Sequence, residues 1–240
     1  MRAILLLILA LPLVARGAEE PKLYHAPIDP RDALSMQRGA RTFVNYCLSC
    51  HSAEAMRYSR LEDLGLDRKQ ISDFLMFPTT KIGDLMNVAM RKSDAKAWFG
   101  TAPPDLSVIG RSRSADWLYT YLLSFYRDDK TATGWNNLVF PSVAMPHVLW
   151  ELQGEQTLKL DERKSEHGTE EVRTLTLQSP GKLSPLEYEK AVADLVNYLV
   201  YMSEPARETR IRVGYAVLLF LALLFVPVYL LKREYWKDVH

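Results

Sequence analysis

The chain has 240 residues, enough for one domain with a full hydrophobic core and some additional segments. Its 30 Lys and Arg residues nearly balance its 29 Asp and Glu residues, which argues against both a nucleic-acid-binding surface and a disordered acidic chain. Both cysteines lie in the segment 47–51, so neither is left for a structural disulfide.

Residues 1–18 have the pattern of a secretory signal peptide. A positively charged start precedes an apolar run over residues 3–14, and small residues follow, with cleavage expected near Gly17 or Ala18. A retained membrane anchor is the alternative, but the run is well short of the roughly 20 residues that a bilayer core requires. We therefore expect the rest of the chain to begin on the exported side.

An amphipathic helix is predicted over residues 35–46. Its apolar residues recur at helical spacing and would share one face: Met36, Ala40, Phe43 and Val44. This helix leads directly into Cys47.

The Cys-x-x-Cys-His motif formed by Cys47, Cys50 and His51 predicts the covalent attachment of one haem. The two thiols add across the haem vinyl groups, and the adjacent imidazole binds the iron. A thioredoxin-like redox pair would follow a strand of a βαβ unit, whereas Cys47 follows a helical pattern. A zinc site would require a second cysteine pair or clustered histidines, and the sequence supplies neither.

Two arginines follow the proline-rich turn at residues 102–105. A guanidinium group pairs bidentately with a carboxylate, so Arg111 or Arg113 could bind a haem propionate. Two solvated arginines are the alternative, and the residues alone do not decide between these interpretations.

A second iron ligand is expected beside His51, because an open iron position would invite oxygen or peroxide chemistry. Met145 is the favoured candidate, since Pro146 prevents a regular helix there and stiffens the loop. The alternatives are Met86, Met90 and His147.

Three further elements are predicted before the C-terminal segment. Residues 117–126 are expected to form an aromatic-rich helix. Residues 153–178 are highly charged and alternate weakly, which indicates a short hairpin or excursion outside the core. A last helix begins with a capping-box spacing between Ser184 and Glu187 and is expected to end at Pro205. The domain is therefore predicted to be mainly α-helical.

Residues 213–231 are uncharged, apolar on every helical face and long enough to span a bilayer. A buried core helix is the alternative. Basic residues flank the segment on both sides, so charge leaves its orientation undecided, and we rely on the signal peptide. On that basis residues 19–212 would lie in the periplasm, and residues 232–240 would form a cytoplasmic tail.

Five segments resemble the cytochrome c1 family, the haem subunits of cytochrome bc1 complexes, in its bacterial form. They are RGARTFVNYCLSCHS from Arg38, MRYSRL from Met56, WFGTAPPDLSVIGRSR from Trp98, GWNNLVFPSVAMPHVLW from Gly134 and YLVYMSEPARETR from Tyr198. The haem motif alone fits many cytochromes, but its combination with PPDLS, an Ala-Met-Pro loop and a C-terminal apolar span is highly specific. The resemblance implies a class I cytochrome c core with insertions. It also implies site roles: Cys47 and Cys50 for the thioether bonds, His51 and Met145 as iron ligands, and Arg113 as the propionate partner.

The resemblance further implies an electron relay within ubiquinol:cytochrome c reductase, anchored in the inner membrane. The haem c would accept an electron from a Rieske iron–sulfur protein and pass it to a soluble cytochrome c, with cytochrome b and the lipid bilayer as further partners. One membrane helix cannot enclose a quinol pocket, so the chain is expected to be a subunit of the enzyme that does not itself bind quinol. The alternatives are a membrane-tethered shuttle, a thiol:disulfide oxidoreductase using the two cysteines, and a structural subunit with a silent haem.

Overall fold

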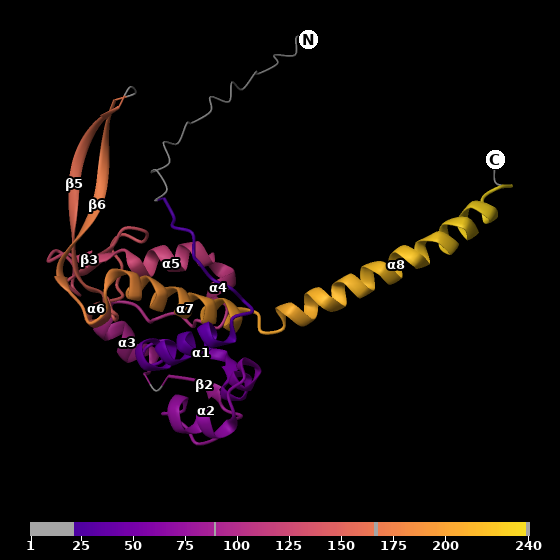
Figure 1. The fold of residues 1–240 in the computed structure, drawn as a ribbon, viewed down its shortest axis with the longest axis horizontal. Helices are drawn as coiled ribbons and strands as arrows, with labels where there is room; N and C mark the ends of the chain where they lie inside the picture. Colours follow the sequence, from indigo (N-terminus) through magenta and orange to yellow (C-terminus); the bar gives the residue numbers. More distant parts are fainter. Residues whose placement is uncertain (1–21, 89, 166–167, 239–240) are drawn as a thin grey trace, which may run out of the picture.

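The computed structural model describes residues 22–88, 90–165 and 168–238, which form a helical domain with two long extensions (Figure 1). The predicted signal peptide lies outside the described residues. The helices are α1 (Ala33–Thr42), the π-helix η1 (Phe43–Cys47), the 3-10 helix η2 (Tyr58–Leu64), α2 (Arg68–Leu75), α3 (Lys92–Phe99), α4 (Ile109–Ser112), α5 (Ala115–Leu123), α6 (Trp150–Gln153), α7 (Pro185–Ser203) and α8 (Arg207–Tyr235). The strands are β1 (Ala53–Arg57), β2 (Leu85–Met86), β3 (Phe125–Arg127), β4 (Trp135–Asn137), β5 (Gly154–Ser165) and β6 (Gly168–Pro180). Helices predominate, as predicted, and within the described residues the strands form only antiparallel pairs, β1–β2, β3–β4 and β5–β6.

The domain core is built where α7 packs against α1, α4 and α5. Both α1 and α7 begin with side-chain caps. Asp32 Oδ1 accepts a hydrogen bond from the Ser35 backbone N–H at 2.9 Å, and Ser184 and Glu187 form the predicted capping box. The last helix of the domain is thus confirmed, although it ends at Ser203, two residues before the expected Pro205.

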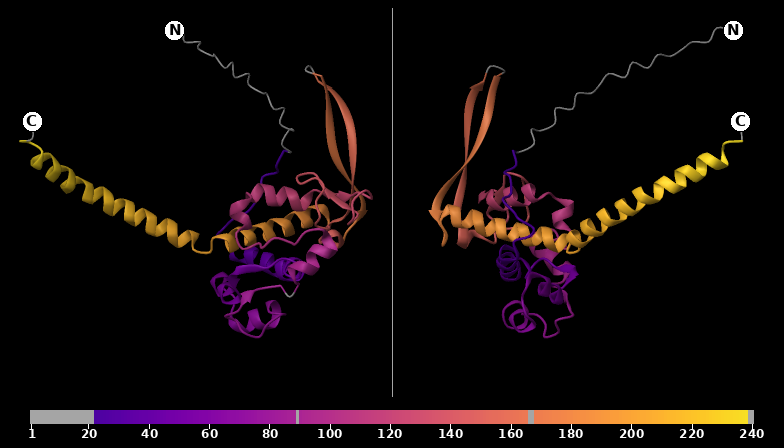
Figure 2. Two further views of the ribbon diagram at one scale, coloured as in Figure 1. Left: turned by 180° about the vertical axis from the view of Figure 1, so that it is seen from behind. Right: turned by 45° about the vertical axis from the view of Figure 1, so that its right-hand side comes forward.

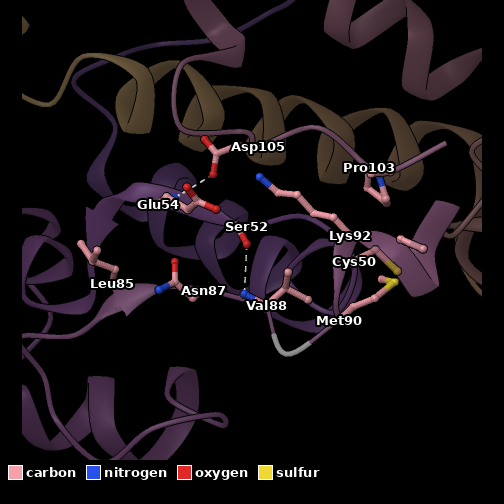
Figure 3. A pocket seen from close by; sticks show the side chains of 12 residues that line it. Cys50, Ser52, Glu54, Leu85, Asn87, Val88, Met90, Lys92, Pro103 and Asp105 are labelled. Carbon is pink, nitrogen blue, oxygen red and sulfur yellow. Dashed lines mark hydrogen bonds between the residues drawn. The ribbon is translucent and has the colours of Figure 1, made fainter.

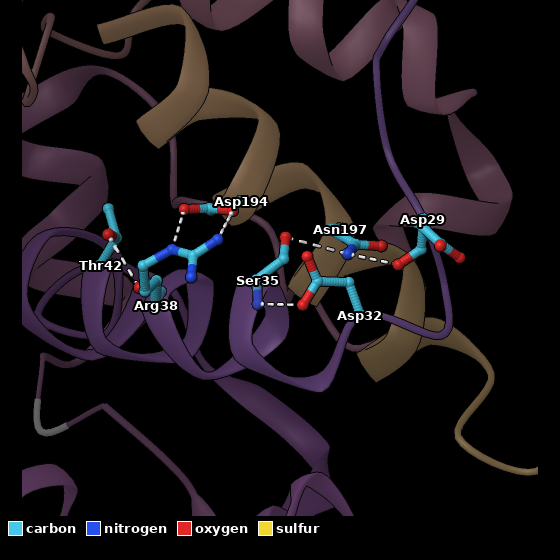
Figure 4. Close-up of polar contacts among 7 residues, drawn as sticks. All are labelled: Asp29, Asp32, Ser35, Arg38, Thr42, Asp194 and Asn197. Carbon is cyan, nitrogen blue, oxygen red and sulfur yellow. Dashed lines mark hydrogen bonds and ion pairs between the residues drawn. The ribbon is translucent and has the colours of Figure 1, made fainter. Parts of the chain in front are cut away.

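Polar contacts fix α1 and α7 relative to each other (Figure 4). Arg38 donates to both carboxylate oxygens of Asp194, from Nε at 2.6 Å and from Nη2 at 2.9 Å. The fully buried Asn197 donates from Nδ2 to the Asp29 carbonyl at 2.7 Å and to Ser35 Oγ at 3.0 Å. These contacts set the position of α1, and therefore of the cysteine that follows it.

The predicted helix over residues 35–46 is confirmed as α1 followed by η1. All four residues of its predicted apolar face are buried: Met36, Ala40, Phe43 and Val44. The Leu48 backbone N–H bonds the Phe43 carbonyl at 3.0 Å, which closes the wider turn of a π-helix. Cys47 ends this helix in a buried position.

The helix predicted over residues 117–126 is only partly correct. The helix α5 ends at Leu123, and the chain then forms the short strand β3, which pairs with β4. Phe125 and Tyr126 are aromatic residues that suit a strand as well as a helix, and the partner strand decides the outcome. Helical periodicity alone could not have shown this pairing.

The charged segment forms a hairpin outside the core, as predicted, but it is longer than expected. Strands β5 and β6 have 12 and 13 residues and pair in antiparallel register. In all three ribbon views the hairpin projects away from the helical body (Figures 1 and 2).

The C-terminal helix α8 is the second extension, and it contains the whole predicted span, residues 213–231. Its 29 residues make it long and apolar enough to cross a membrane, and its apolar window is not buried against the rest of the chain. Pro227 lies inside this helix without ending it. Because its apolar surface is uncovered, the alternative of a buried core helix is excluded for this segment.

Candidate haem site

A cavity of about 320 Å³ lies inside the helical domain, with a lining that is almost entirely apolar or aromatic. It is bounded by η1 and the haem motif, by the segment 99–109, by α5, by the loop 140–148 and by α7. The five residues predicted to bind haem all line it: Cys47, Cys50, His51, Arg113 and Met145. Residues about 100 positions apart in the chain therefore meet at one site.

The cysteine thiols are presented by a tight turn. The backbone N–H groups of Cys50 and His51 both bond the Cys47 carbonyl, at 3.0 and 2.8 Å. Burial, with a smaller contribution from the neighbouring Cys50, raises the pKa of Cys47 to about 12. A redox-active cysteine requires a lowered pKa, because the thiolate is the nucleophile. This environment therefore argues against the thiol:disulfide oxidoreductase considered above.

His51 is held by the proline-rich turn. Its Nδ1 lies 2.8 Å from the Pro104 carbonyl oxygen, which can only accept, so Nδ1 carries the proton and donates. The ring is buried, and burial lowers the pKa of His51 and keeps the imidazole neutral. The lone pair is therefore left on Nε2, which is the arrangement typical of a metal-binding histidine.

The same turn is anchored to the segment after the motif. The Leu106 backbone N–H bonds the Ser52 carbonyl at 2.8 Å, and Asp105 Oδ2 accepts from the Glu54 backbone N–H at 2.8 Å. These contacts hold the PPDLS turn in place, and the turn positions the Pro104 carbonyl that orients His51.

Met145 also lines the cavity, in a loop that the side chains of two asparagines hold in place. Asn136 Oδ1 accepts from the Ser142 backbone N–H at 2.8 Å. Asn137 is fully buried, and its Oδ1 accepts from the backbone N–H groups of Val139 and Phe140, at 2.9 and 3.1 Å. Sequence analysis did not assign a role to either asparagine, since each acts through backbone atoms several residues away.

Tyr121 is a further cavity residue that the sequence did not single out. Its hydroxyl lies 3.3 Å from Met145 Sδ and donates a hydrogen bond to that sulfur. The residue was predicted to be part of an aromatic helix, but a helical pattern does not show which aromatic ring reaches a loop 24 residues later.

The structure distinguishes the two arginines that the sequence left open. Arg113 lines the cavity, with its guanidinium carbon 4.8 Å from the centre of the Trp117 ring. Arg111 does not belong to that lining, and its Nη1 lies 3.9 Å from a carboxylate oxygen of Glu204, at the junction of α7 and α8.

The alternative iron ligands lie elsewhere. Met86 is fully buried and accepts a hydrogen bond from the Tyr198 hydroxyl at 3.6 Å. Met90 lines a second hollow, of about 470 Å³, which Cys50 also lines (Figure 3). His147 is buried and stacks on Phe125, with ring centres 4.8 Å apart, and burial lowers its pKa to about 4. None of these three belongs to the described lining of the haem cavity.

Comparison with known proteins decides the family. The model of the cytochrome c1 family matches residues 24–165 and 184–239. The chain belongs to the cytochrome c1 family. The residues between the two matched stretches, 166–183, include all of β6, so this part of the projecting hairpin lies outside the family pattern.

Three relatives illustrate the range of similarity. A cytochrome c1 from Allochromatium vinosum is 48% identical over 99% of this chain and 98% of its own length. A cytochrome c1 from Rhodospirillum rubrum is 27% identical over 87% of this chain and 83% of its own length. A Nitrosomonas europaea protein named ammonia monooxygenase gamma subunit is 51% identical over 99% of this chain and 97% of its own length.

As a cytochrome c1, this chain binds haem c covalently and transfers electrons in a cytochrome bc1 complex. The cavity fits such a group. It brings together two thiols, an imidazole whose Nε2 carries the lone pair, a thioether and a guanidinium within an apolar lining.

Proposed function

We propose that this cytochrome c1 accepts electrons from a Rieske iron–sulfur protein and passes them to a soluble cytochrome c on the periplasmic side of the inner membrane. The single observation that carries the proposal is the convergence of the motif residues and Met145 on one cavity in a chain of this family. When bound there, haem supplies a one-electron couple. The chain would act as a relay and not as a complete quinol oxidase.

Each cavity residue has a separate role in this proposal. Cys47 and Cys50 would hold the cofactor through thioether bonds, and His51 Nε2 and Met145 Sδ would be the iron ligands. Arg113 binds a propionate. The apolar lining would exclude water, and two protein ligands on the iron would prevent oxygen from binding to it.

The domain organisation is part of the same proposal. Residues 19–212 form a class I cytochrome c-like domain with insertions, residues 213–231 cross the membrane, and residues 232–240 remain in the cytoplasm. The uncovered apolar surface of α8 supports the membrane segment. The signal-peptide pattern of residues 1–18 supports the orientation. Cytochrome b and the Rieske protein would be the partners within the complex.

The name of the Nitrosomonas europaea relative raises a second candidate, a subunit of an ammonia-oxidising monooxygenase. A monooxygenase iron needs an open position for oxygen, whereas Met145 lines this cavity and carries the thioether that would close that position. The cavity therefore favours electron relay over oxygen chemistry for this chain.

The proposed electron path is tested by mixing quinol with the purified complex, with and without its Rieske subunit. With the Rieske subunit present, quinol should reduce the c-type haem, and added soluble cytochrome c should then reoxidise it. After removal of the subunit, reduction should fall to the rate of a blank without enzyme, and adding the subunit back should restore it. Reduction at an unchanged rate without the Rieske subunit would contradict the path.

A further inference from the structure

Among the described residues, the hydrogen-bond partner of the Tyr121 hydroxyl is the sulfur of Met145, the proposed iron ligand. Its oxygen lies 3.3 Å from Met145 Sδ. A phenol can donate, and a thioether sulfur is a weak acceptor, so the hydrogen points to the sulfur. The ligand proposed for the iron therefore accepts a hydrogen bond from another residue that lines the same cavity.

The Tyr121 ring is held rigidly by its aromatic neighbours. It stacks on Trp117, with ring centres 4.9 Å apart and planes 11° from parallel. On another side it meets Phe125 edge to face, with ring centres 5.0 Å apart. Such pairs restrict where the ring can move, so the hydroxyl is fixed in front of the sulfur by packing as well as by the hydrogen bond.

We propose that Tyr121 is a positioning residue that orients Met145 and raises the reduction potential of the haem by donating to the Met145 sulfur. This inference rests on the proposed role of Met145 as iron ligand. A hydrogen bond to the sulfur draws electron density away from it, so the sulfur donates less to the iron. Ferric iron depends on that donation more than ferrous iron does, and the reduced state is therefore favoured.

The test is the variant Tyr121→Phe in the intact complex, with two measurements. The first is the midpoint potential of the c-type haem. The second is the far-red absorption band that arises from methionine sulfur bound to ferric iron. We expect the band to remain and the equilibrium constant for reduction to fall about three- to tenfold, the range of one net hydrogen bond. A tenfold fall is about 59 mV for one electron.

Tyr119→Phe is the matched control. Tyr119 lies on the same helix and is also buried, but it does not belong to the described lining of the cavity. The midpoint potential of the c-type haem in the Tyr119→Phe complex should equal that in the unmodified complex. Tyr121→Leu, which also lacks the donor, serves as the second variant if Tyr121→Phe does not assemble.

The outcomes separate the two proposals. A Tyr121 variant with the far-red band and an unchanged potential would overturn the role of Tyr121 and leave Met145 in place. Absence of the band from the unmodified complex would overturn Met145 as iron ligand, and the role of Tyr121 with it. A fall in potential that Tyr119→Phe reproduces would also contradict the inference, because it would not depend on the sulfur contact.

Discussion

Replacing Met145 with leucine should leave haem covalently attached but make it a poor electron acceptor. The thioether bonds and His51 are untouched by this change, whereas the sulfur that favours the reduced state is lost. A fall in potential of about 120 mV would disfavour reduction about a hundredfold for a one-electron couple. Quinol-dependent reduction of soluble cytochrome c should therefore fall to a small fraction of its original rate. The reduced haem should also bind carbon monoxide, because an iron position has opened.

Met86→Leu is the matched control for this prediction, since Met86 was an alternative ligand and is fully buried outside the cavity. It should retain the potential and should not bind carbon monoxide. If Met86→Leu instead produced these changes and Met145→Leu did not, the ligand assignment would be wrong. The amount of covalently attached haem is measured in both variants by its peroxidase activity on denaturing gels. Equal amounts would show that a loss of turnover does not result from a loss of haem.

Substituting Gly39 with alanine should strongly destabilise the domain. A Cβ at this position would lie 2.7 Å from Tyr198 Cβ, and it would overlap still more closely with the Asp194 carbonyl group of α7. The backbones of α1 and α7 would have to separate at the place where the core is built. Overpacking of this kind costs about 3 kcal/mol at the upper end of its usual range. For a chain of this size, that corresponds to a fall in melting temperature of about 6–12 °C.

The measurement is thermal unfolding of the full chain in mild detergent, followed by circular dichroism. Gly83→Ala provides the control, because a Cβ at that glycine would meet nothing within 4 Å and the backbone is not in the left-handed region. Its unfolding free energy should change by about 0.5 kcal/mol at most. Equal melting temperatures for the two variants would show that the close contact of α1 and α7 is not a constraint on the fold.

Features that depend on neighbouring residues in the chain could be predicted from the sequence. The haem motif needs only five consecutive residues, and the capping box of α7 needs only four. The apolar span in α8 is likewise a local property. In each case the physical cause lies within one continuous stretch of the chain, so the pattern and the structure agree.

Features that depend on distant contacts could not be predicted. The residue pattern alone did not distinguish Arg111 from Arg113, and only the family resemblance favoured Arg113. In the structure Arg111 lies beside the carboxylate of Glu204, more than 90 positions later in the chain. The end of α5 depends on the pairing of β3 with β4. The hydrogen bond from Tyr121 to Met145 joins a helix to a loop whose path is set by the side chains of Asn136 and Asn137. The periodicity of a short segment gives no information about contacts with such distant residues.

The most direct test of the account is a spectrum of the complex purified through a tagged copy of this chain from membranes in mild detergent. We predict that b-type and c-type haem co-purify in the reduced-minus-oxidised spectrum, that the oxidised complex has the far-red methionine band, and that quinol reduces the c-type haem. If gentle extraction recovers only c-type haem and quinol does not reduce it, the chain is a tethered cytochrome or a silent subunit and not the relay proposed here.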